Sequence, residues 1–280
     1  MVCEMERKPT CAIVVPVYRE TLPETERISF ERCLSVLGSH PIILVTYPGL
    51  DLEAYRERAH ACGATFSVRH FGRKSFDGIH GYNTLMLSPA FYDAFRDFDY
   101  ILICQLDAYV FEDRLEAWCA KDYDYIGGPV YAPRSMDLGL ATVGNGGFSL
   151  RRIEAFRNAV TARLSPFARR KPHPYINWRK KIIYSLMLAS SGRSERLRAF
   201  FSHWVPEDLF FSLALQGTKA ELHVPAAAEA LDFAIDLHPE VAFDRNGADW
   251  RPFGWHQWHR FPQYRDKLDL PGNPATSSNR

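Results

Sequence analysis

Four short segments of this sequence carry residues that could do chemistry. The first is the apolar run ILICQLDAYVFE at 101–112, in which a single carboxylate, Asp107, follows a stretch that suits a buried strand. An unpaired carboxylate is costly to bury and cheap to expose. At a strand's end, Asp107 could meet a metal ion or a ribose hydroxyl. The structural alternative is an aspartate that caps a helix or turns the chain, and this segment alone leaves both interpretations open.

The second segment, VGNGGFSLRR at 143–152, is rich in glycine. Gly146 and Gly147 beside Asn145 give a backbone that a ligand can approach closely, because no Cβ obstructs it. A hairpin turn is the structural alternative, since Asn-Gly is a strong turn signal. The spacing matches neither GxGxxG nor GxxxxGK[ST], so it predicts neither a Rossmann nor a P-loop site.

The third segment, PEDLFFSLAL at 206–215, begins with a proline and two carboxylates. This order predicts the start of a helix, where negative charge is favourable near the positive end of the helix dipole. Helix capping alone would explain both acids. In a cleft, however, Glu207 could raise the pKa of Asp208 and make it a general base.

The fourth segment, PFGWHQWHRF at 252–261, places His256 and His259 three residues apart among aromatic side chains. A histidine in an apolar segment is more often structural than a ligand. Histidine is also the commonest metal ligand, and neighbouring aromatic rings could stack on a base or a sugar.

The elements that must position these segments are strands and helices that alternate through about the first 110 residues. Apolar strands are predicted at 11–18, 41–47, 65–71 and 100–111, and helices at 24–38, 51–63 and 81–95, the last broken at Pro89. Such alternation predicts a parallel sheet covered on both faces, with ligands beyond the carboxyl ends of its strands. Asp107 lies at such an end. The second half of the chain is less regular.

Composition limits the classes of partner and compartment. The chain has 280 residues, 46% of them hydrophobic, and a net charge of +1, so no global field draws it to nucleic acid. The polar, charged start of the sequence predicts no secretory signal, and no apolar stretch approaches the ~18 residues of a membrane span. Six cysteines are scattered singly. They are expected to be free thiols in a reducing cytoplasm, without zinc or disulfides.

Taken together, these segments resemble GT-A type glycosyltransferases and, more closely, a glycosyltransferase-like family of bacterial and fungal proteins. The family's pattern reads here as QLDAYVF, YIGGPVY, GNGGFSLRR, EDLFFS and FGWHQW, and the resemblance covers about residues 11–258. It implies an α/β fold with a mixed, largely parallel sheet sandwiched by helices and an irregular C-terminal half. One catalytic domain, 1–270, is expected to comprise a nucleotide-binding half at 11–110 and an acceptor and catalytic half at 111–270, followed by a disordered tail at 271–280.

The resemblance also implies a metal. GT-A enzymes usually hold a divalent cation on an acidic DxD element that ends a strand, and the matching triplet here is Asp107-Ala108-Tyr109, with only the first acid present. Mn²⁺ or Mg²⁺ would be held by Asp107 and by His256, which matches the C-terminal histidine of many GT-A enzymes. Phosphate and water oxygens would complete the shell.

The same resemblance implies the remaining functions of single residues. Asn83 and the residues of the triplet would contact the donor. The Gly-Gly loop would close over donor sugar and acceptor, and Asp208 would be the base, oriented or raised in pKa by Glu207. The end of the first strand would flank the base with Pro16, Val17 and Tyr18 and meet phosphate or ribose with Arg19. The loop residues are Asn145, Gly146 and Gly147.

The expected activity is the transfer of a sugar from a nucleotide-sugar donor to a glycan or a lipid-linked saccharide, with inversion. Two alternatives stay open. A catalytically degenerate module would bind nucleotide or glycan without turnover, and the missing second acid favours it. A nucleotidyltransferase would be expected to have a glycine- and lysine-rich loop near the first strand, and VVPVYRETLPE has neither.

One segment bears on location. Residues 168–188 combine basic side chains with Trp178 and several aliphatic residues, which is typical of a helix on an anionic membrane surface. The alternative is a solvated helix that packs its apolar side on the core. The protein is expected in the cytoplasm, and at the inner membrane surface if the membrane interpretation holds.

Overall fold

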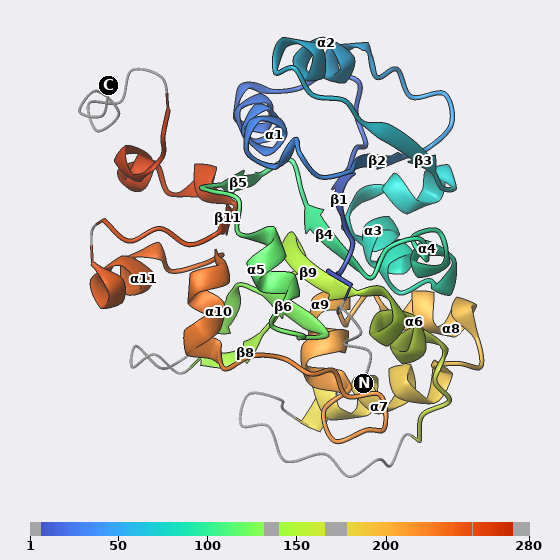
Figure 1. Ribbon diagram of the computed structural model, residues 1–280. Helices are drawn as coiled ribbons and strands as arrows, with labels where there is room; N and C mark the ends of the chain where they lie inside the picture. Colours follow the sequence, from blue (N-terminus) through green and yellow to red (C-terminus); the bar gives the residue numbers. More distant parts are fainter. Residues whose placement is uncertain (1–6, 132–139, 166–177, 248, 271–280) are drawn as a thin grey trace, which may run out of the picture.

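The computed structural model describes residues 7–131, 140–165, 178–247 and 249–270 (Figure 1). Within these ranges the central sheet has six strands in the order β3-β2-β1-β4-β9-β6. β1, β2, β3 and β4 run parallel, whereas β9 is antiparallel to both of its neighbours. The predicted mixed, largely parallel sheet is therefore confirmed. The strands are β1 (Cys11–Pro16), β2 (Ile42–Thr46), β3 (Ser67–His70), β4 (Tyr100–Cys104), β6 (Tyr125–Gly127) and β9 (Phe148–Arg152).

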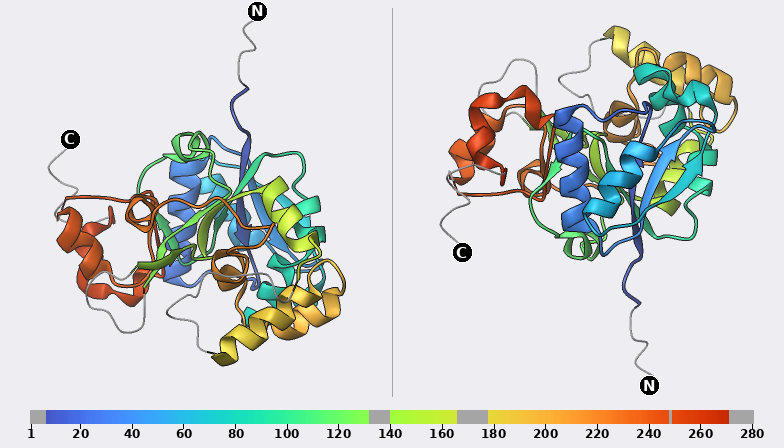
Figure 2. Two further views of the ribbon diagram at one scale, coloured as in Figure 1. Left: turned by 90° about the horizontal axis from the view of Figure 1, so that it is seen from below. Right: turned by 90° about the horizontal axis from the view of Figure 1, so that it is seen from above.

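Helices cover both faces of this sheet, and Figure 2 shows the sheet between α1 on one side and α6 on the other. The helices of the first half lie close to where the sequence predicts them, whereas those of the second half are short or irregular. They are α1 (Glu24–Leu37), α2 (Glu53–Ala61), α3 (Gly78–Met86), α4 (Pro89–Asp93), α5 (Leu115–Cys119), α6 (Ile153–Thr161), α7 (Trp178–Ser190), α8 (Glu195–Phe201), α9 (Glu207–Leu209), α10 (Ala227–Phe233) and α11 (Pro239–Asn246). A π-helix (Phe210–Ala214) continues α9.

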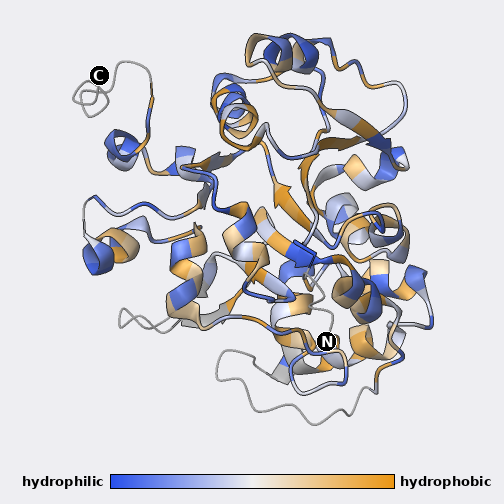
Figure 3. Ribbon diagram, in the orientation of Figure 1, coloured by the Kyte–Doolittle hydropathy of each residue, from blue (hydrophilic) through white to orange (hydrophobic). Residues whose placement is uncertain are grey.

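Alternation along the strands builds two cores. In β1, Ile13 and Val15 face a core that includes the buried side of α1, while Ala12 and Val14 face a second core under α4 and α6. Successive strand residues point to opposite faces, so an all-apolar strand fills both. Figure 3 shows the central strands as the most hydrophobic part of the ribbon.

Local sequence explains the helices that flank the site. In α1, the buried residues Phe30, Cys33, Leu34 and Leu37 recur at helical spacing and form one apolar face. The predicted break at Pro89 separates α3 from α4, because the Ser88 hydroxyl accepts a hydrogen bond from the amide of Ala90 and starts a new helix.

The predicted strand at 100–111 is wrong in one respect, because it is two strands. β4 ends at Cys104, and a turn closed by a hydrogen bond from Ala108 N to Gln105 O leads to β5 (Ala108–Val110). β5 belongs to a separate small sheet with β11 (Gly254–His256) and β10 (Ala234–Ile235). The turn places Asp107 between the two sheets. A third, two-stranded sheet pairs β7 (Pro129–Tyr131) with β8 (Leu140–Val143).

The structure describes five of the six cysteines. The five described cysteines, Cys11, Cys33, Cys62, Cys104 and Cys119, are free thiols. None of the helices in the described part of the chain has the length and apolar content needed to cross a membrane. The predicted tail at 271–280 and residues 168–177 of the predicted basic segment lie outside the described residues.

Candidate active site

A cavity of about 660 Å³ opens where the parallel strands end. This is the edge at which α/β sheets bind ligands, and the volume lies within the range of small-molecule sites. Segments that are far apart in the sequence meet there: the ends of β1 and β4, the start of α3, the glycine loop before β9, the start of α9 and the end of β11. Of the predicted site residues, Pro16, Tyr18, Asn83, Asp107, Asn145, Gly146, Gly147, Glu207, Asp208 and His256 line it.

Four residues predicted to contact the donor do not line this cavity. The side chains of Val17, Ala108 and Tyr109 are fully buried and do not line the cavity. Asp107 lies in the turn between β4 and β5 and lines the cavity, whereas Ala108 and Tyr109 belong to the buried strand β5. Tyr109 instead accepts a hydrogen bond from Asp269 N through its hydroxyl. Arg19 also lies outside the cavity lining, and its guanidinium pairs at 3.1 Å with Glu26, which does line the cavity.

Asp107 and His256 form the polar centre of the cavity floor. The Nε2 of His256 lies 3.3 Å from the Oδ1 of Asp107 and 3.2 Å from the Oε1 of Gln105, while its Nδ1 bonds Asp236 at 2.8 Å. The antiparallel pairing of β5 with β11, which sets His256 opposite Ala108, holds these side chains together. Sequence reasoning missed Gln105 and Asp236, and no sequence signal marks Asp236.

Neighbouring charges shift the pKa values of His256 and Asp107 in opposite directions. Burial alone would lower the pKa of His256, but the hydrogen bonds and charges of Asp107 and Asp236 outweigh it and raise the pKa to about 9. For Asp107, burial would raise the pKa, and the imidazolium of His256 more than offsets it, so the pKa lies below its usual value. At neutral pH the pair is therefore ionic.

The donor set also fits a divalent cation. A histidine whose Nδ1 is held by a carboxylate and whose Nε2 faces a second carboxylate has the usual arrangement of a metal-binding imidazole. Asp107 and His256 would supply one oxygen and one nitrogen, with the amide oxygen of Gln105 beside them. In the described part of the chain, no three His, Cys, Asp or Glu side chains are grouped to hold a metal alone. Ligand phosphates and water would have to complete the shell.

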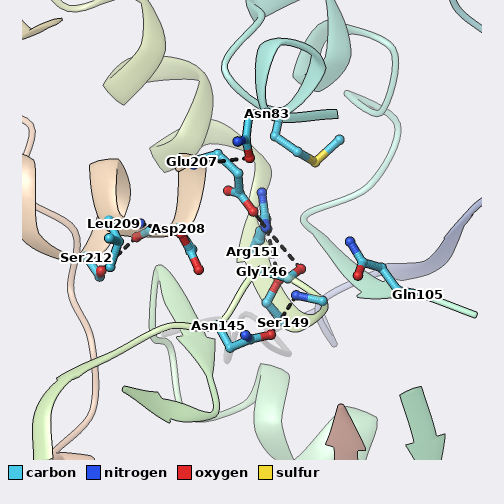
Figure 4. Close-up of polar contacts among 12 residues, drawn as sticks. Asn83, Gln105, Asn145, Gly146, Ser149, Arg151, Glu207, Asp208, Leu209 and Ser212 are labelled. Atoms are coloured by element: carbon cyan, nitrogen blue, oxygen red, sulfur yellow. Dashed lines mark hydrogen bonds and ion pairs between the residues drawn. The ribbon is translucent and has the colours of Figure 1, made fainter. Parts of the chain in front are cut away.

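The two acids at the start of α9 lie in different environments, as Figure 4 shows. Glu207 is buried, and its Oε1 accepts a hydrogen bond from the Nη2 of Arg151 at 2.9 Å. The half-buried Asp208 forms no salt bridge with any residue that the structure describes; its Oδ1 accepts a hydrogen bond from the backbone amide of Leu209 at 2.7 Å. Burial, with the nearby charge of Glu207 adding to it, raises the pKa of Asp208 to about 7. A carboxylate with this pKa can accept a proton near neutral pH.

Arg151 ties this helix start to the glycine loop, and the sequence analysis did not single it out. Its guanidinium is fully buried and donates to the carbonyl oxygen of Gly146 at 3.3 Å as well as to Glu207. The hydroxyl of Ser149 donates to the same carbonyl at 3.1 Å. Asn83, from α3, accepts a hydrogen bond from the amide of Glu207 at 3.4 Å. The loop, α3 and α9 are thus joined around one ion pair.

The sequence of the chain matches one protein family. The family model described as "Protein of unknown function (DUF5672)" matches residues 65–256, which span β3 to β11 and contain all of the polar centre. The chain belongs to the DUF5672 family. No curated protein matches this DUF5672 chain in sequence.

Solved structures identify the fold. Core-mannan synthase A (CmsA/Ktr4) from Aspergillus fumigatus, in its Mn/GDP form, superposes with a TM-score of 0.50 at 12% identity, over 76% of this chain and 70% of that chain. The galactosyltransferase LgtC, in complex with donor and acceptor sugar analogs, gives 0.50 at 10% identity over 93% and 98%. The DUF5672 chain therefore has the fold of GT-A glycosyltransferases, as its sequence predicts.

Replacing Gly147 with alanine should damage the polar centre without unfolding the protein. A Cβ at Gly147 would overlap the Nε2 of His256, which cannot move away because Asp236 holds the ring. If the polar centre holds Mn²⁺, as the resemblance implies, the affinity for Mn²⁺ is expected to fall by about 10–100-fold. Electron paramagnetic resonance of free Mn²⁺ measures this. Gly72→Ala is the matched control, since nothing lies within 4 Å of its added Cβ. Equal affinities in both variants would contradict the assignment of His256.

Proposed function

We propose that this DUF5672 protein is a glycosyltransferase that uses a nucleotide-sugar donor and a glycan or lipid-linked saccharide acceptor. The observation that carries the proposal is the presence, in one cavity, of the Asp107–His256 pair and of an aspartate, Asp208, whose pKa is raised to about 7. The first group suits a diphosphate with its cation, and the second suits an acceptor hydroxyl. The GT-A fold supports the same reaction class by analogy.

In this proposal the donor diphosphate lies near Asp107 and His256, and Tyr18 and Pro16 flank the nucleoside. Asn145 and the backbone of the glycine loop enclose the transferred sugar. A divalent cation, Mn²⁺ or Mg²⁺, held by Asp107 and His256, would supply Lewis-acid stabilisation of the charge that grows on the leaving phosphate. The Nε2–H of a protonated His256 would stabilise the same charge if no cation were bound.

Transfer itself requires one proton acceptor. The bond between the anomeric carbon and the diphosphate breaks as the acceptor oxygen bonds to that carbon, and the acceptor's proton passes to Asp208. Glu207 is held by Arg151, so Asp208 is the free carboxylate of the two. With Asp208 as the base and direct attack by the acceptor oxygen, the proposed displacement inverts the anomeric carbon.

A thermal-shift screen of nucleotide sugars with and without Mn²⁺ tests the proposal. A donor at 100 times its Kd should raise the melting temperature by about 5 °C or more, because it binds only the folded state. The Mn²⁺-dependent part of the shift should disappear in Asp107→Asn and His256→Ala and persist in His60→Ala, a variant of an exposed histidine on α2. If no nucleotide sugar stabilises the protein in either condition, the proposal fails.

The degenerate binding module remains the second candidate, because only one acid of the DxD element is present. The two candidates differ in turnover. Incubating the stabilising donor with Mn²⁺ and following release of free nucleoside diphosphate separates them, since slow donor hydrolysis is expected of a transferase without its acceptor. Tight binding with no release under these conditions, and with no transfer to any saccharide, would favour the binding module.

A further inference from the structure

An exposed apolar cluster lies beside the cavity, and we name it the apolar lip: Ile79, Leu197, Phe200 and Trp204. Their side chains are 77%, 51%, 54% and 53% exposed, respectively. Single exposed apolar residues are normal on protein surfaces, whereas contiguous groups that include aromatic rings mark interaction sites. Nothing in the proposed reaction uses Phe200 or Trp204, since neither lines the cavity.

Ring contacts connect Phe200 and Trp204 of the lip to α3, which borders the cavity. Phe200 and Trp204 have ring centroids 5.0 Å apart, and Trp204 contacts His203 at 5.9 Å. His203 in turn stacks on His80 of α3 at 3.4 Å. The neighbour of His80, Ile79, is part of the cavity lining. Figure 2 shows α7 and α8 gathered beside α3 at one end of the molecule.

The segment that runs from α7 to Trp204 is basic, although α8 itself contains two arginines and one glutamate. Residues 178–204 contain six Lys/Arg residues and one acid, Glu195, a net charge of +5, whereas the whole chain has a net charge of +1. Arg179, Arg193 and Arg196 are exposed there. On α8, Arg196 is exposed whereas Arg198 is buried, so Arg196 is the basic side chain of this helix that a surface docked on the lip could meet.

The described part of the predicted basic segment, 178–188, lies in the helix α7. In α7, Tyr184, Met187 and Leu188 are buried in the core, so the helix packs its apolar side inward, as the structural alternative held. Only Ile182 and Leu186 of its described apolar residues are among the large exposed ones. The stronger apolar surface is on α8 and the start of α3, outside 168–188.

We propose that the apolar lip docks on the surface of an anionic lipid bilayer, with Phe200 and Trp204 inserted at the headgroup level and Arg196 beside the lipid phosphates. Aromatic rings favour this interface, and each basic side chain near an anionic surface adds about 1 kcal/mol of attraction. A bilayer fits better than a protein partner because positive charge and exposed rings occur together. Docking does not rest on the proposed function. Only its consequence does, namely that an acceptor saccharide on a lipid would enter the cavity past Ile79.

Co-sedimentation of the full chain with vesicles tests the docking. We expect binding to vesicles of phosphatidylcholine with phosphatidylglycerol and little binding to phosphatidylcholine alone. The double variant Phe200→Ser/Trp204→Ser and the single variant Arg196→Glu should each lower the partition coefficient about tenfold or more. Matched controls are Leu237→Ser, at an exposed leucine elsewhere, and Arg245→Glu, on α11, and both should bind like the wild type. Circular dichroism melting checks that every variant is folded.

Three results would overturn the docking proposal: no binding to anionic vesicles, equal losses in the lip variants and the controls, or a dimer in solution that the Phe200/Trp204 variant dissociates. The last result would assign the lip to contact with a second copy of the chain. Vesicle binding needs no donor, so it can fail while nucleotide sugars still stabilise the protein. Conversely, vesicle binding with no donor-dependent stabilisation would leave the docking intact and reject the transferase.

Discussion

Asp208→Asn is expected to abolish sugar transfer while the protein still binds its donor. A positioned general base contributes about 10²–10⁴-fold to the rate, and asparagine keeps the shape of aspartate but cannot accept the proton. The measurement is the initial rate of transfer from the donor found by thermal shift, with the donor's Kd determined on the same sample. Asp244→Asn, at an exposed aspartate on α11, is the matched control.

The rate should also depend on pH in a way that identifies Asp208. Because burial raises the pKa of Asp208 to about 7, the fraction of ionised carboxylate, which is the form that can accept a proton, decreases below pH 7. The rate of the wild type is expected to rise with pH through about 7 and then level off. An aspartate with an ordinary pKa of about 3.9 would give a flat profile over the same range. A flat profile, or a transfer rate in Asp208→Asn equal to that of the wild type, would remove Asp208 from the mechanism.

Stability provides a third readout for the same variant. The folded protein binds the proton of Asp208 more tightly than the unfolded chain does, so stability falls as pH rises from the usual aspartate pKa towards 7. Asparagine has no such ionisation. Asp208→Asn should therefore be at least as stable as the wild type at pH 8, which separates loss of catalysis from loss of folding.

The first half of the fold follows closely from its sequence because its signals are local. β1 and β2 are continuous runs of β-branched and aliphatic residues, and α1 has its apolar residues at helical spacing and stops at Gly38. The prediction of one strand at 100–111 is wrong because the apolar run in the sequence continues through Leu106 and Ala108 and shows no break. The break after Cys104 is decided by pairing of β5 with β11, more than a hundred residues away, and no local pattern encodes that.

Part of the site can also be predicted from the sequence, because the order of strands and helices places some of its residues. Strand ends of a parallel sheet meet at one edge, so Asp107 and Pro16 could be placed there from topology alone. The ion pair was not foreseen, although β9 gives a signal: Ser149 and Arg151 alternate with apolar residues on a buried strand, which requires a buried polar partner. That partner, Glu207, comes from a distant segment, and only the folded chain identifies it.

Breaking the Arg151–Glu207 pair is expected to destabilise the protein strongly. The two side chains are 0% and 3% exposed, and they lie 2.9 Å apart. Arg151→Met leaves a buried carboxylate without its cation, and Glu207→Gln leaves a buried guanidinium without its anion. Each should lower the free energy of unfolding by about 3–5 kcal/mol, whereas removing both charges in Arg151→Met/Glu207→Gln should cost much less than the sum. Urea unfolding measures all three.

The exposed pair Lys8–Glu116 is the control, since its side chains are 83% and 67% exposed and Lys8→Met should change stability by less than about 1 kcal/mol. The double variant Arg151→Met/Glu207→Gln also tests whether the Arg151–Glu207 pair positions the glycine loop. Without the bond from Arg151 to the carbonyl of Gly146, the glycine loop loses its link to α9, so the KM for the donor should rise in a folded protein. Additive losses of stability would show that the charges do not interact, and a double variant with unchanged KM would show that the loop is held by Ser149 alone.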